Sequence, residues 1–440
     1  MPVPSSMRRR WFVVVAAVAV AACGAGSAQP DATPADAAPD ARAAPDYGRL
    51  FPTDRVIDVA LDTSAADWAA LMADPLNDAL QIPATVTYDG AVVTQVSLST
   101  KGNSSRNSVR AMGSQRYSFK LDLDERVPGQ RLFGVDKLNL HNSFKDPTLL
   151  RETIGYAMMQ GAGVPASRTA FARLTINGQP WGLYVVVEQV EADFLRDRFG
   201  AADGELLKPD QPSGPLTLRG ATFADYPGVE VKLDGGDPTH QRFLDLIAAL
   251  DHGTEAEVAA VLDVDRLLPW LAINTYLANL DSYAGSAHNY YLYLDPASAR
   301  WILVPWDLNE TFGNFRCGWT AANIVALDHL RPQCNQPAPR PLISKVLASP
   351  TWRARYQALL RDLIAGPGAP TAVRIDVDAR AALIRDAVAA DPTKFFTLAQ
   401  FDTAIHDDLP VTNQPGLDSA ILGLTAFAER RAAALATQLP

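Results

Sequence analysis

The chain has 440 residues, of which 48% are hydrophobic and 20% charged, and its formal net charge is −10 at pH 7. A chain this acidic lacks the broad basic surface that nucleic-acid binding needs, so we predict no nucleic-acid partner. The roughly 390 residues after position 46 are enough for a large core. None of their segments is apolar for long enough to span a bilayer.

The N-terminal segment predicts export. Basic residues at 8–10 precede an apolar run over 11–20 that is too short for a comfortable membrane span. Small residues then lead to Cys23 in a pattern that resembles a bacterial lipobox. We therefore predict a lipoprotein signal peptide over residues 1–23, with a lipid on Cys23 as the only membrane anchor of an exported cell-envelope protein. An ordinary secretory signal cleaved near Ala28 is the alternative, and a short uncleaved anchor is a third.

Residues 24–46 are rich in Ala, Pro and Asp and have almost no large apolar side chains. Such a segment buries too little surface to offset the entropy lost on ordering, so we predict a disordered tether. Residues 47–440 are then expected to form one catalytic unit, with a β-rich part over about 47–208 and a helical part over about 239–440.

The β-rich part is predicted from alternating apolar runs and tight turns. Asp89-Gly90 and Asn177-Gly178 are typical of two-residue hairpin turns. We predict strands over 56–61, 82–88, 92–98, 116–124, 137–142, 171–176 and 181–188, a strand ending at 207–208, and helices over 65–72, 148–160 and 191–199. The run 181–188 is almost wholly apolar, so we expect it at the centre of a sheet.

From residue 239 onward the sequence becomes helical. Ala- and Leu-rich segments occupy 240–262, 266–280, 342–364, 376–390 and 416–438. We therefore predict an α+β fold of two lobes, in which a mixed β-rich lobe precedes a mainly helical one.

A hairpin with polar residues at both ends carries the strongest functional signal. Asp281 and Asn289 come before its first apolar run, and Asp307 comes just after its second. Because a hairpin returns its ends to one place, the three side chains are expected to converge. An Asp near an accepting hydroxyl, with an Asn and a second Asp on a metal, is the layout of a phosphoryl-transfer site. Each residue taken alone is also common in turns and helix caps.

Two other features bear on the site. Residues 101–106 form a basic, hydroxyl-rich segment with Asn103 and Ser104, which can present N–H groups to an anion but is also typical of solvated turns. Cys317 and Cys334 are expected to form a disulfide in an exported protein, with two buried free thiols as the alternative. The sequence has no CxxC pair and no His-rich cluster, so we do not expect a zinc site.

Several ordered motifs resemble the CotH family, whose members include spore-coat proteins and secreted or surface proteins. The resemblance spans roughly residues 50 to 435 and rests on the motifs at 102–105, 151–152, 177–188, 279–281, 288–293 and 306–308. It implies an atypical protein-kinase-like fold that uses ATP and Mg²⁺ or Mn²⁺, and some members phosphorylate Ser residues of other proteins.

The resemblance also implies roles for single residues. Asp281 is similar to the catalytic Asp that orients or deprotonates the acceptor hydroxyl, and Asp307 to the metal-binding Asp, with Asn289 as the second metal contact. Asn309 stands where many relatives carry another acid.

The nucleotide-binding residues are inferred from the order of strands and helices. Lys120 and Glu152 are expected to form the Lys–Glu pair of kinases. Glu188 ends the central strand where a kinase hinge would begin, and either contacts the nucleotide base or caps the next helix. Three other lysines compete with Lys120 for its role, namely Lys101, Lys137 and Lys208.

Three functions follow as hypotheses. The first is a tethered, metal-dependent protein kinase that phosphorylates Ser or Thr residues of envelope or surface proteins. The second is a non-catalytic surface protein that uses the same fold for adhesion or assembly, since free ATP is scarce outside the cytoplasm. The third is transfer of AMP, because kinase-like folds can bind ATP in altered orientations.

Overall fold

The computed structural model describes residues 44–411 and 420–440, and Ala44–Pro440 form one compact unit. The predicted signal peptide, Cys23 and residues 24–43 of the predicted tether lie outside the described residues. Within the described ranges, no helix is both long and apolar enough to cross a membrane.

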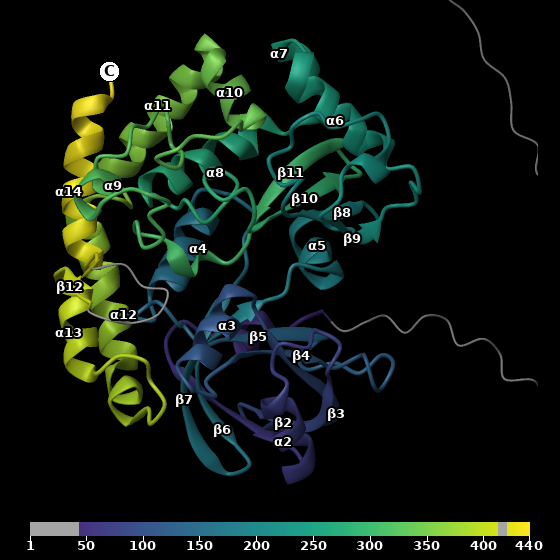
Figure 1. Cartoon of the computed structure of the whole chain (residues 1–440), viewed down its shortest axis with the longest axis vertical. Helices are drawn as coiled ribbons and strands as arrows, with labels where there is room; N and C mark the ends of the chain where they lie inside the picture. The colour runs from purple at the N-terminus through teal and green to yellow at the C-terminus, as the bar shows by residue number, and fades with distance from the viewer. Residues whose placement is uncertain (1–43, 412–419) are drawn as a thin grey trace, which may run out of the picture. The chain divides into compact units, whose positions relative to one another are not determined.

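The strands of the N-terminal half form a closed barrel (Figure 1). They are β1 (Val56–Asp62), β2 (Ile82–Tyr88), β3 (Ala91–Lys101), β4 (Ser118–Asp122), β5 (Lys137–His141), β6 (Thr169–Ile176) and β7 (Gln179–Glu188). Their order around the barrel is β1-β2-β3-β4-β5-β7-β6, and parallel pairing of β1 with β6 closes it.

The α+β class agrees with the sequence prediction, whereas the closed barrel corrects it. The strands were expected to build a kinase-like lobe, and closure was not foreseen. Turn signals such as Asn177-Gly178 specify only strands that are adjacent in the sequence. The closing seam instead pairs Asp58 with Arg173, which lie 115 residues apart, so only tertiary contacts determine it.

The barrel strands present two chemically different faces. Phe119 of β4 and its partner Leu140 of β5 belong to the cluster that fills the barrel. Because successive side chains of a strand alternate, Ser118 and His141 point outward. Lys101 of β3 pairs with Ser118 and shares its face. Lys101 and His141 therefore lie on the outer face of the barrel, at the ends of β3 and β5.

Strand β7 lies between β5 and β6, which confirms its predicted central position. Tyr184 and Val186 pack inside the barrel, while Val185 and Val187 belong to the cluster formed with the helical part. Burial of both faces explains why this strand is apolar throughout.

The second sheet contains the predicted hairpin. Its strands, in the order β11-β10-β8-β9, are β8 (Glu205–Pro209), β9 (Val229–Asp234), β10 (Tyr290–Asp295) and β11 (Arg300–Pro305). The hairpin pairs Tyr290 with Pro305 at its open end. Strand β9 was not predicted, although its sequence alternates apolar and polar residues as strands do. A further pair of short strands comprises β12 (Leu409–Pro410) and β13 (Ala420–Ile421).

The helices of the described residues are α1 (Tyr47–Leu50), α2 (Ala65–Ala73), α3 (Ser104–Ala111), α4 (Arg151–Gly161), α5 (Ala192–Phe199), α6 (Gln241–His252), α7 (Glu255–Val261), α8 (Val264–Tyr276), α9 (Ala321–Val325), α10 (Pro341–Ala348), α11 (Pro350–Ala365), α12 (Pro370–Ala390), α13 (Leu398–His406) and α14 (Leu424–Gln438). Single 3-10 turns occur at η1 (Phe223–Asp225) and η2 (Leu308–Glu310).

Two helices predicted as continuous are each divided by a cap. Thr254 forms a capping box with Glu257, which begins α7 after α6 has ended. Ser349 caps α11, and Pro350 occupies its first turn, so the predicted helix over 342–364 becomes α10 and α11. Hydrophobic periodicity continues across both breaks, which is why periodicity alone missed them.

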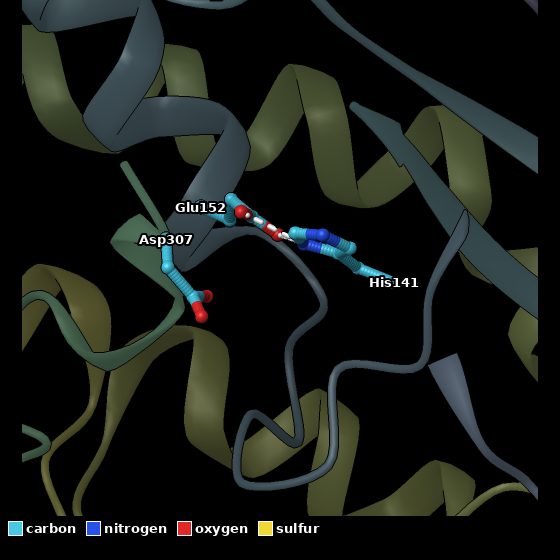
Figure 2. Close-up of side chains that lie close together, drawn as sticks. All are labelled: His141, Glu152 and Asp307. Carbon is cyan, nitrogen blue, oxygen red and sulfur yellow. Dashed lines mark hydrogen bonds and ion pairs between the residues drawn. The ribbon is translucent and has the colours of Figure 1, made fainter. Parts of the chain in front are cut away.

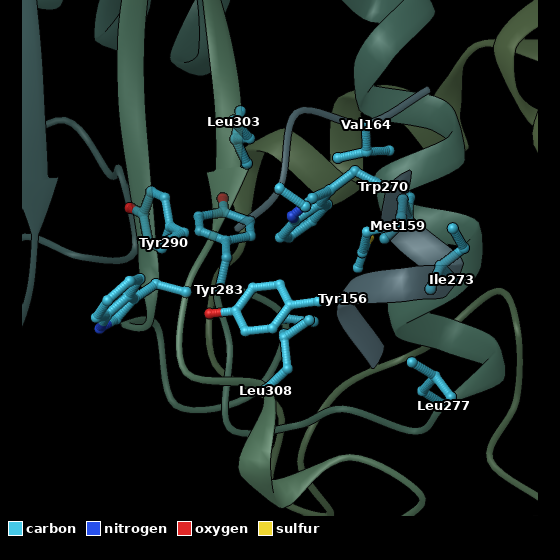
Figure 3. Packing of buried hydrophobic residues seen from close by; sticks show 14 of the residues in the cluster. Tyr156, Met159, Val164, Trp270, Ile273, Leu277, Tyr283, Tyr290, Leu303 and Leu308 are labelled. Atoms are coloured by element: carbon cyan, nitrogen blue, oxygen red, sulfur yellow. The ribbon is translucent and has the colours of Figure 1, made fainter. Parts of the chain in front are cut away.

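Helix α4 connects the barrel to the larger apolar core. Figure 3 shows Tyr156 and Met159 of α4 near Trp270 and Ile273 of α8. A Cβ atom on Gly155 would lie 3.2 Å from Leu308 Cβ, so the missing side chain lets α4 approach η2 closely. This approach places α4 directly behind the segment that follows the hairpin.

Candidate active site

The loop that enters the hairpin holds the Asp281 carboxylate through three neighbours. His288 Nε2 lies 2.7 Å from Asp281 Oδ1, and the Ser286 hydroxyl donates to the same oxygen at 3.0 Å. The Asn289 amide donates to Asp281 Oδ2 at 3.1 Å and to its backbone carbonyl at 3.0 Å. The carboxylate is thereby fixed in orientation while its side chain stays 19% exposed, so a hydroxyl group can reach it.

Asp307 is positioned by both the hairpin and α4. The backbone N–H of Trp306 donates to the carbonyl of Asn289 at 3.1 Å, which joins the two ends of the hairpin. The backbone N–H of Asp307 donates to the Tyr156 hydroxyl at 3.0 Å. Asn289 and Asp307 both adopt left-handed backbone conformations, with φ of 58° and 53°. Asn and Asp adopt this conformation more readily than other non-glycine residues, so both residue types suit these positions.

A chain of polar groups lies beside Asp307, and Figure 2 shows two of its members, His141 and Glu152. Lys101 Nζ lies 2.6 Å from His141 Nε2, and His141 Nδ1 lies 2.9 Å from Glu152 Oε2. Lys101 also lies over the ring of Trp306, 4.8 Å from its centroid. The imidazole therefore links a lysine of β3 to a glutamate of α4, where ordinary kinases join the two directly.

The charge states of this chain follow from burial. Burial, assisted by the nearby Lys101 ammonium, lowers the pKa of His141 to about 3, so the ring is neutral. A neutral ring accepts a hydrogen bond from Lys101 at Nε2 and donates one to Glu152 from Nδ1. Burial also lowers the pKa of Lys101 and raises that of Glu152, and each charge opposes the other's shift.

Asp307 is suited to hold a divalent cation. Burial raises the pKa of its carboxyl, and Oδ1 is buried with no hydrogen-bond partner among the described residues. Carboxylate and amide oxygens are ligands that Mg²⁺ and Mn²⁺ accept, so Asp307 and the side-chain oxygen of Asn289 fit the predicted metal. His141 and Glu152 also lie near Asp307, but both imidazole nitrogens already have partners.

Asp281, Asp307 and Glu310 belong to one electrostatic neighbourhood. The Asp281 charge raises the pKa of Asp307, and both charges raise that of Glu310, although burial is the main cause for each. Glu310 Oε1 lies 2.6 Å from Lys145 Nζ. The structure therefore brings Asp281, Asn289 and Asp307 together, as expected for residues at the two ends of one hairpin.

The predicted pair of Lys120 with Glu152 is not formed. Lys120 instead lies 3.5 Å from Asp122 and is one-third exposed, while Glu152 binds His141. Lys120 shares the outward face of β4 with Ser118 but lies two residues further along the strand. Lys101, named as a competitor from the sequence, is linked to Glu152 through His141.

Glu188 does not cap the next helix, which was one of its two predicted roles. Its carboxylate accepts the backbone N–H of Arg168 at 2.9 Å and lies 3.0 Å from Arg168 Nη1 and 3.2 Å from Arg198 Nη2. Helix α5 begins after Glu191, so Glu188 does not cap it. Glu188 is buried in an ion-pair network with Arg168 and Arg198, and its predicted contact with a nucleotide base stays a prediction.

The predicted anion loop is partly helical. Helix α3 begins at Ser104, and Asn103 is its N-cap residue, although the Asn103 side chain makes no capping hydrogen bond. Both residues are exposed. Gly102, with φ of +91°, carries the chain from Lys101 into this helix. Asn103 and Ser104 therefore follow the site lysine directly, with their side chains in solvent.

Cys317 and Cys334 are joined by a disulfide that closes a loop of sequence separation 17. This segment follows the Asp307 turn and includes Trp319, whose indole N–H donates to the Gln333 carbonyl at 2.9 Å. The alternative of two free thiols does not apply in this structure.

Sequence reasoning missed three residues of the site. His141, Tyr156 and His288 contact Glu152, Asp307 and Asp281 respectively. His288 lies within the sequence motif that includes Asn289, so its position one residue before Asn289 was a usable signal. His141 and Tyr156 had none, because only the packing of α4 against the barrel and hairpin brings them to the site.

Comparisons with known proteins agree with these motifs. A family model described as CotH kinase protein matches residues 98–435. The chain is 26% identical over 278 residues to inner spore coat protein H of Bacillus subtilis (strain 168), covering 61% of this chain and 73% of that protein. It is 25% identical over 256 residues to the inner spore coat protein H-like protein of the same organism, covering 57% and 67%.

A third relative is the invasin CotH2 of Rhizopus delemar (strain RA 99-880 / ATCC MYA-4621 / FGSC 9543 / NRRL 43880), which is 26% identical over 209 residues. The match covers 41% of this chain and only 34% of the invasin, about a third of its length. Because the family model matches well over half of the residues, the chain belongs to the CotH family.

Proposed function

We propose that this protein is an exported, metal-dependent phosphotransferase that moves a phosphoryl group from ATP to a Ser or Thr hydroxyl of an envelope or surface protein. The observation that carries this proposal is the convergence of Asp281, Asn289 and Asp307 beside the Lys101–His141–Glu152 chain. In the proposal, the outer end of the barrel and the hairpin act as the two halves of a kinase-like site.

Each side chain has a distinct task in this proposal. Asp307 and Asn289 would hold a divalent cation, which would offset the charge of the nucleotide phosphates. Lys101 contacts a phosphate, and His141 and Glu152 fix its position. Asp281 accepts a hydrogen bond from the acceptor hydroxyl and orients it, and His288 holds the Asp281 carboxylate.

The test separates metal binding from acceptor chemistry. Asp307→Asn is expected to weaken Mg²⁺- or Mn²⁺-dependent ATP binding and to reduce transfer. Asp281→Asn is expected to retain ATP binding while transfer falls by roughly 10²-fold or more, the scale of a lost general base or positioning group. Label transfer, ATP binding and melting temperature are measured for both variants. Asp245→Asn, on the surface of α6, is the matched control and should behave as wild type.

A second candidate is a non-catalytic coat or adhesion protein in which the same carboxylates hold a structural ion. One relative is a spore coat protein and another an invasin, which supports this candidate. If the wild type binds no nucleotide with either metal, the kinase proposal fails and this one replaces it. Mass spectrometry of an acceptor incubated with ATP distinguishes phosphate transfer from AMP transfer, the third hypothesis.

A further inference from the structure

A separate cavity lies behind α4, away from the proposed active site. It has a volume of about 510 Å³ and is lined by residues from α4, α8, α11 and α12. With about 3.6 residues per turn, Ala157 and Gly161 of α4 lie on the helix face opposite Glu152. The cavity therefore shares a helix with the proposed active site but none of its residues.

Small residues keep this cavity open. The side chains of Ala157 and Gly161 in α4, of Ala162 just after it, and of Ala272 in α8 and Ala372 in α12 are small or absent. A Cβ atom on Gly161 would meet nothing within 4 Å. The floor is buried and apolar, and it is formed by Ala272 at 2% exposed, Ile273 at 2%, Leu363 at 8% and Val373 at 2%.

The rim of the cavity is acidic. Asp376 of α12 accepts a hydrogen bond from Arg380 Nε at 2.8 Å, so these two charges offset each other. Asp362 of α11 also lines the cavity, and its carboxylate makes no hydrogen bond or ion pair within residues 44–411 and 420–440. Asp362 is exposed to solvent, so one carboxylate without a protein partner stands at the rim of the apolar floor.

We propose that this cavity binds an amphipathic amine, with its apolar body on the floor and its ammonium group at Asp362. Ligand sites in proteins are typically mostly apolar concavities of this size with a few polar groups that fix orientation. A net negative rim selects a cation over a neutral molecule or an anion of the same shape. The proposal does not depend on the proposed phosphotransfer.

The test uses three probes with the same rigid apolar body, namely adamantan-1-amine, adamantan-1-ol and adamantane-1-carboxylate. Their affinities for the purified full chain are measured by isothermal titration calorimetry. We expect the amine to bind about fivefold more tightly than the alcohol, the scale of one partly exposed ion pair, and the carboxylate to bind most weakly. Asp362→Asn should remove the advantage of the amine, whereas Asp386→Asn, an exposed residue of α12 outside the cavity, should leave it unchanged.

A second variant tests the location. Ala372→Phe fills the cavity and should abolish binding of all three probes, while Ala382→Phe, exposed on the same helix, should not. Melting temperatures of both variants show whether they are folded. Equal binding of the three probes, binding that persists in a folded Ala372→Phe variant, or no binding of the amine up to its solubility limit would each overturn the proposal. Asp362→Asn keeps the proposal testable if Ala372→Phe does not fold.

Discussion

A neutral imidazole between an ammonium and a carboxylate is the most specific polar feature of the site. His141 is 5% exposed and uses both ring nitrogens, one toward Lys101 and one toward Glu152. Removing such a linker leaves two charges buried without their partner, and breaking buried charged networks is costly.

We therefore expect His141→Phe, which keeps a flat ring but no nitrogen, to lower the free energy of unfolding by about 2–4 kcal/mol. Chemical denaturation at pH 8 measures the loss. His252→Phe is the matched control, because that side chain is 71% exposed and its removal should change stability little. A loss for His141→Phe no larger than for the control would contradict the assigned hydrogen bonds.

A second buried pair, Glu205 with His240, predicts a pH dependence away from the site. Burial raises the pKa of Glu205 from 4.5 to about 7, partly offset by its hydrogen bond to His240. An acid whose pKa is raised by folding favours the folded state at low pH, and this contribution is lost as the pH rises from about 4.5 through 7.

Glu205→Gln removes this titration while keeping a hydrogen-bonding side chain of the same shape. Relative to wild type, the variant should gain stability between pH 5 and pH 8, on the order of 1–2 kcal/mol. Urea denaturation at several pH values measures the difference. A difference that is constant with pH would show that Glu205 does not titrate in this range.

At the scale of elements, the active-site geometry depends on how closely α4 approaches η2. A Cβ atom on Gly155 would lie 3.2 Å from Leu308 Cβ, 3.3 Å from Leu308 Cδ1 and 3.4 Å from Thr311 Cγ2. These contacts are tight, and the side chains they meet are buried. The same helix positions Glu152 and Tyr156, so displacing it would move both sides of the site.

We expect Gly155→Val to destabilise the protein by about 1–3 kcal/mol, the usual cost of overpacking, and to reduce metal-dependent ATP binding. Gly161→Ala, at the open end of the same helix, is the control and should be neutral or slightly stabilising because alanine is the better helix former. Thermal unfolding and ATP titration of both variants provide the comparison. If both variants had the same stability and the same affinity for ATP, the close approach of α4 to η2 at Gly155 would not determine the geometry of the site.

At the scale of the whole molecule, one buried ion pair joins the barrel to the helical part. Arg116, just before β4, lies 2.8 Å from Asp391, which follows α12, and both side chains are almost fully buried. Asp391 also accepts the backbone N–H of Leu183 in β7 at 2.8 Å. Gly182 makes room for this pair, since a Cβ there would lie 2.3 Å from Arg116 Nη1.

Asp391→Asn should lower the free energy of unfolding by about 3–5 kcal/mol, because it leaves the Arg116 charge buried without a counter-ion. The double change Arg116→Met with Asp391→Leu removes both charges but leaves the Leu183 N–H without its acceptor, so it should recover only part of that loss. The exposed pair Arg385–Asp402 serves as control, and Asp402→Asn should cost less than about 1 kcal/mol. Chemical denaturation of the wild type and the three variants measures these free energies. A loss for Asp391→Asn no larger than for Asp402→Asn would show that burial does not determine the contribution of the ion pair.

The sequence by itself determined the class of fold, most strands and helices, and the three residues at the ends of the hairpin. Alternation, turn dipeptides such as Asn177-Gly178 and capping residues act locally, so they can be recognised without the fold. The convergence of Asp281, Asn289 and Asp307 also followed from local geometry, because the two strands of one hairpin bring them together.

Only the tertiary structure decided the rest. Closure of the barrel pairs β1 with β6. Helix α4 packs near the end of β3, so Lys101 and not Lys120 is linked to Glu152 through His141. His141 reaches Glu152 by the same packing. Contacts between elements distant in the sequence leave no periodic or turn signal, because they arise from the packing of whole elements and not from neighbouring residues.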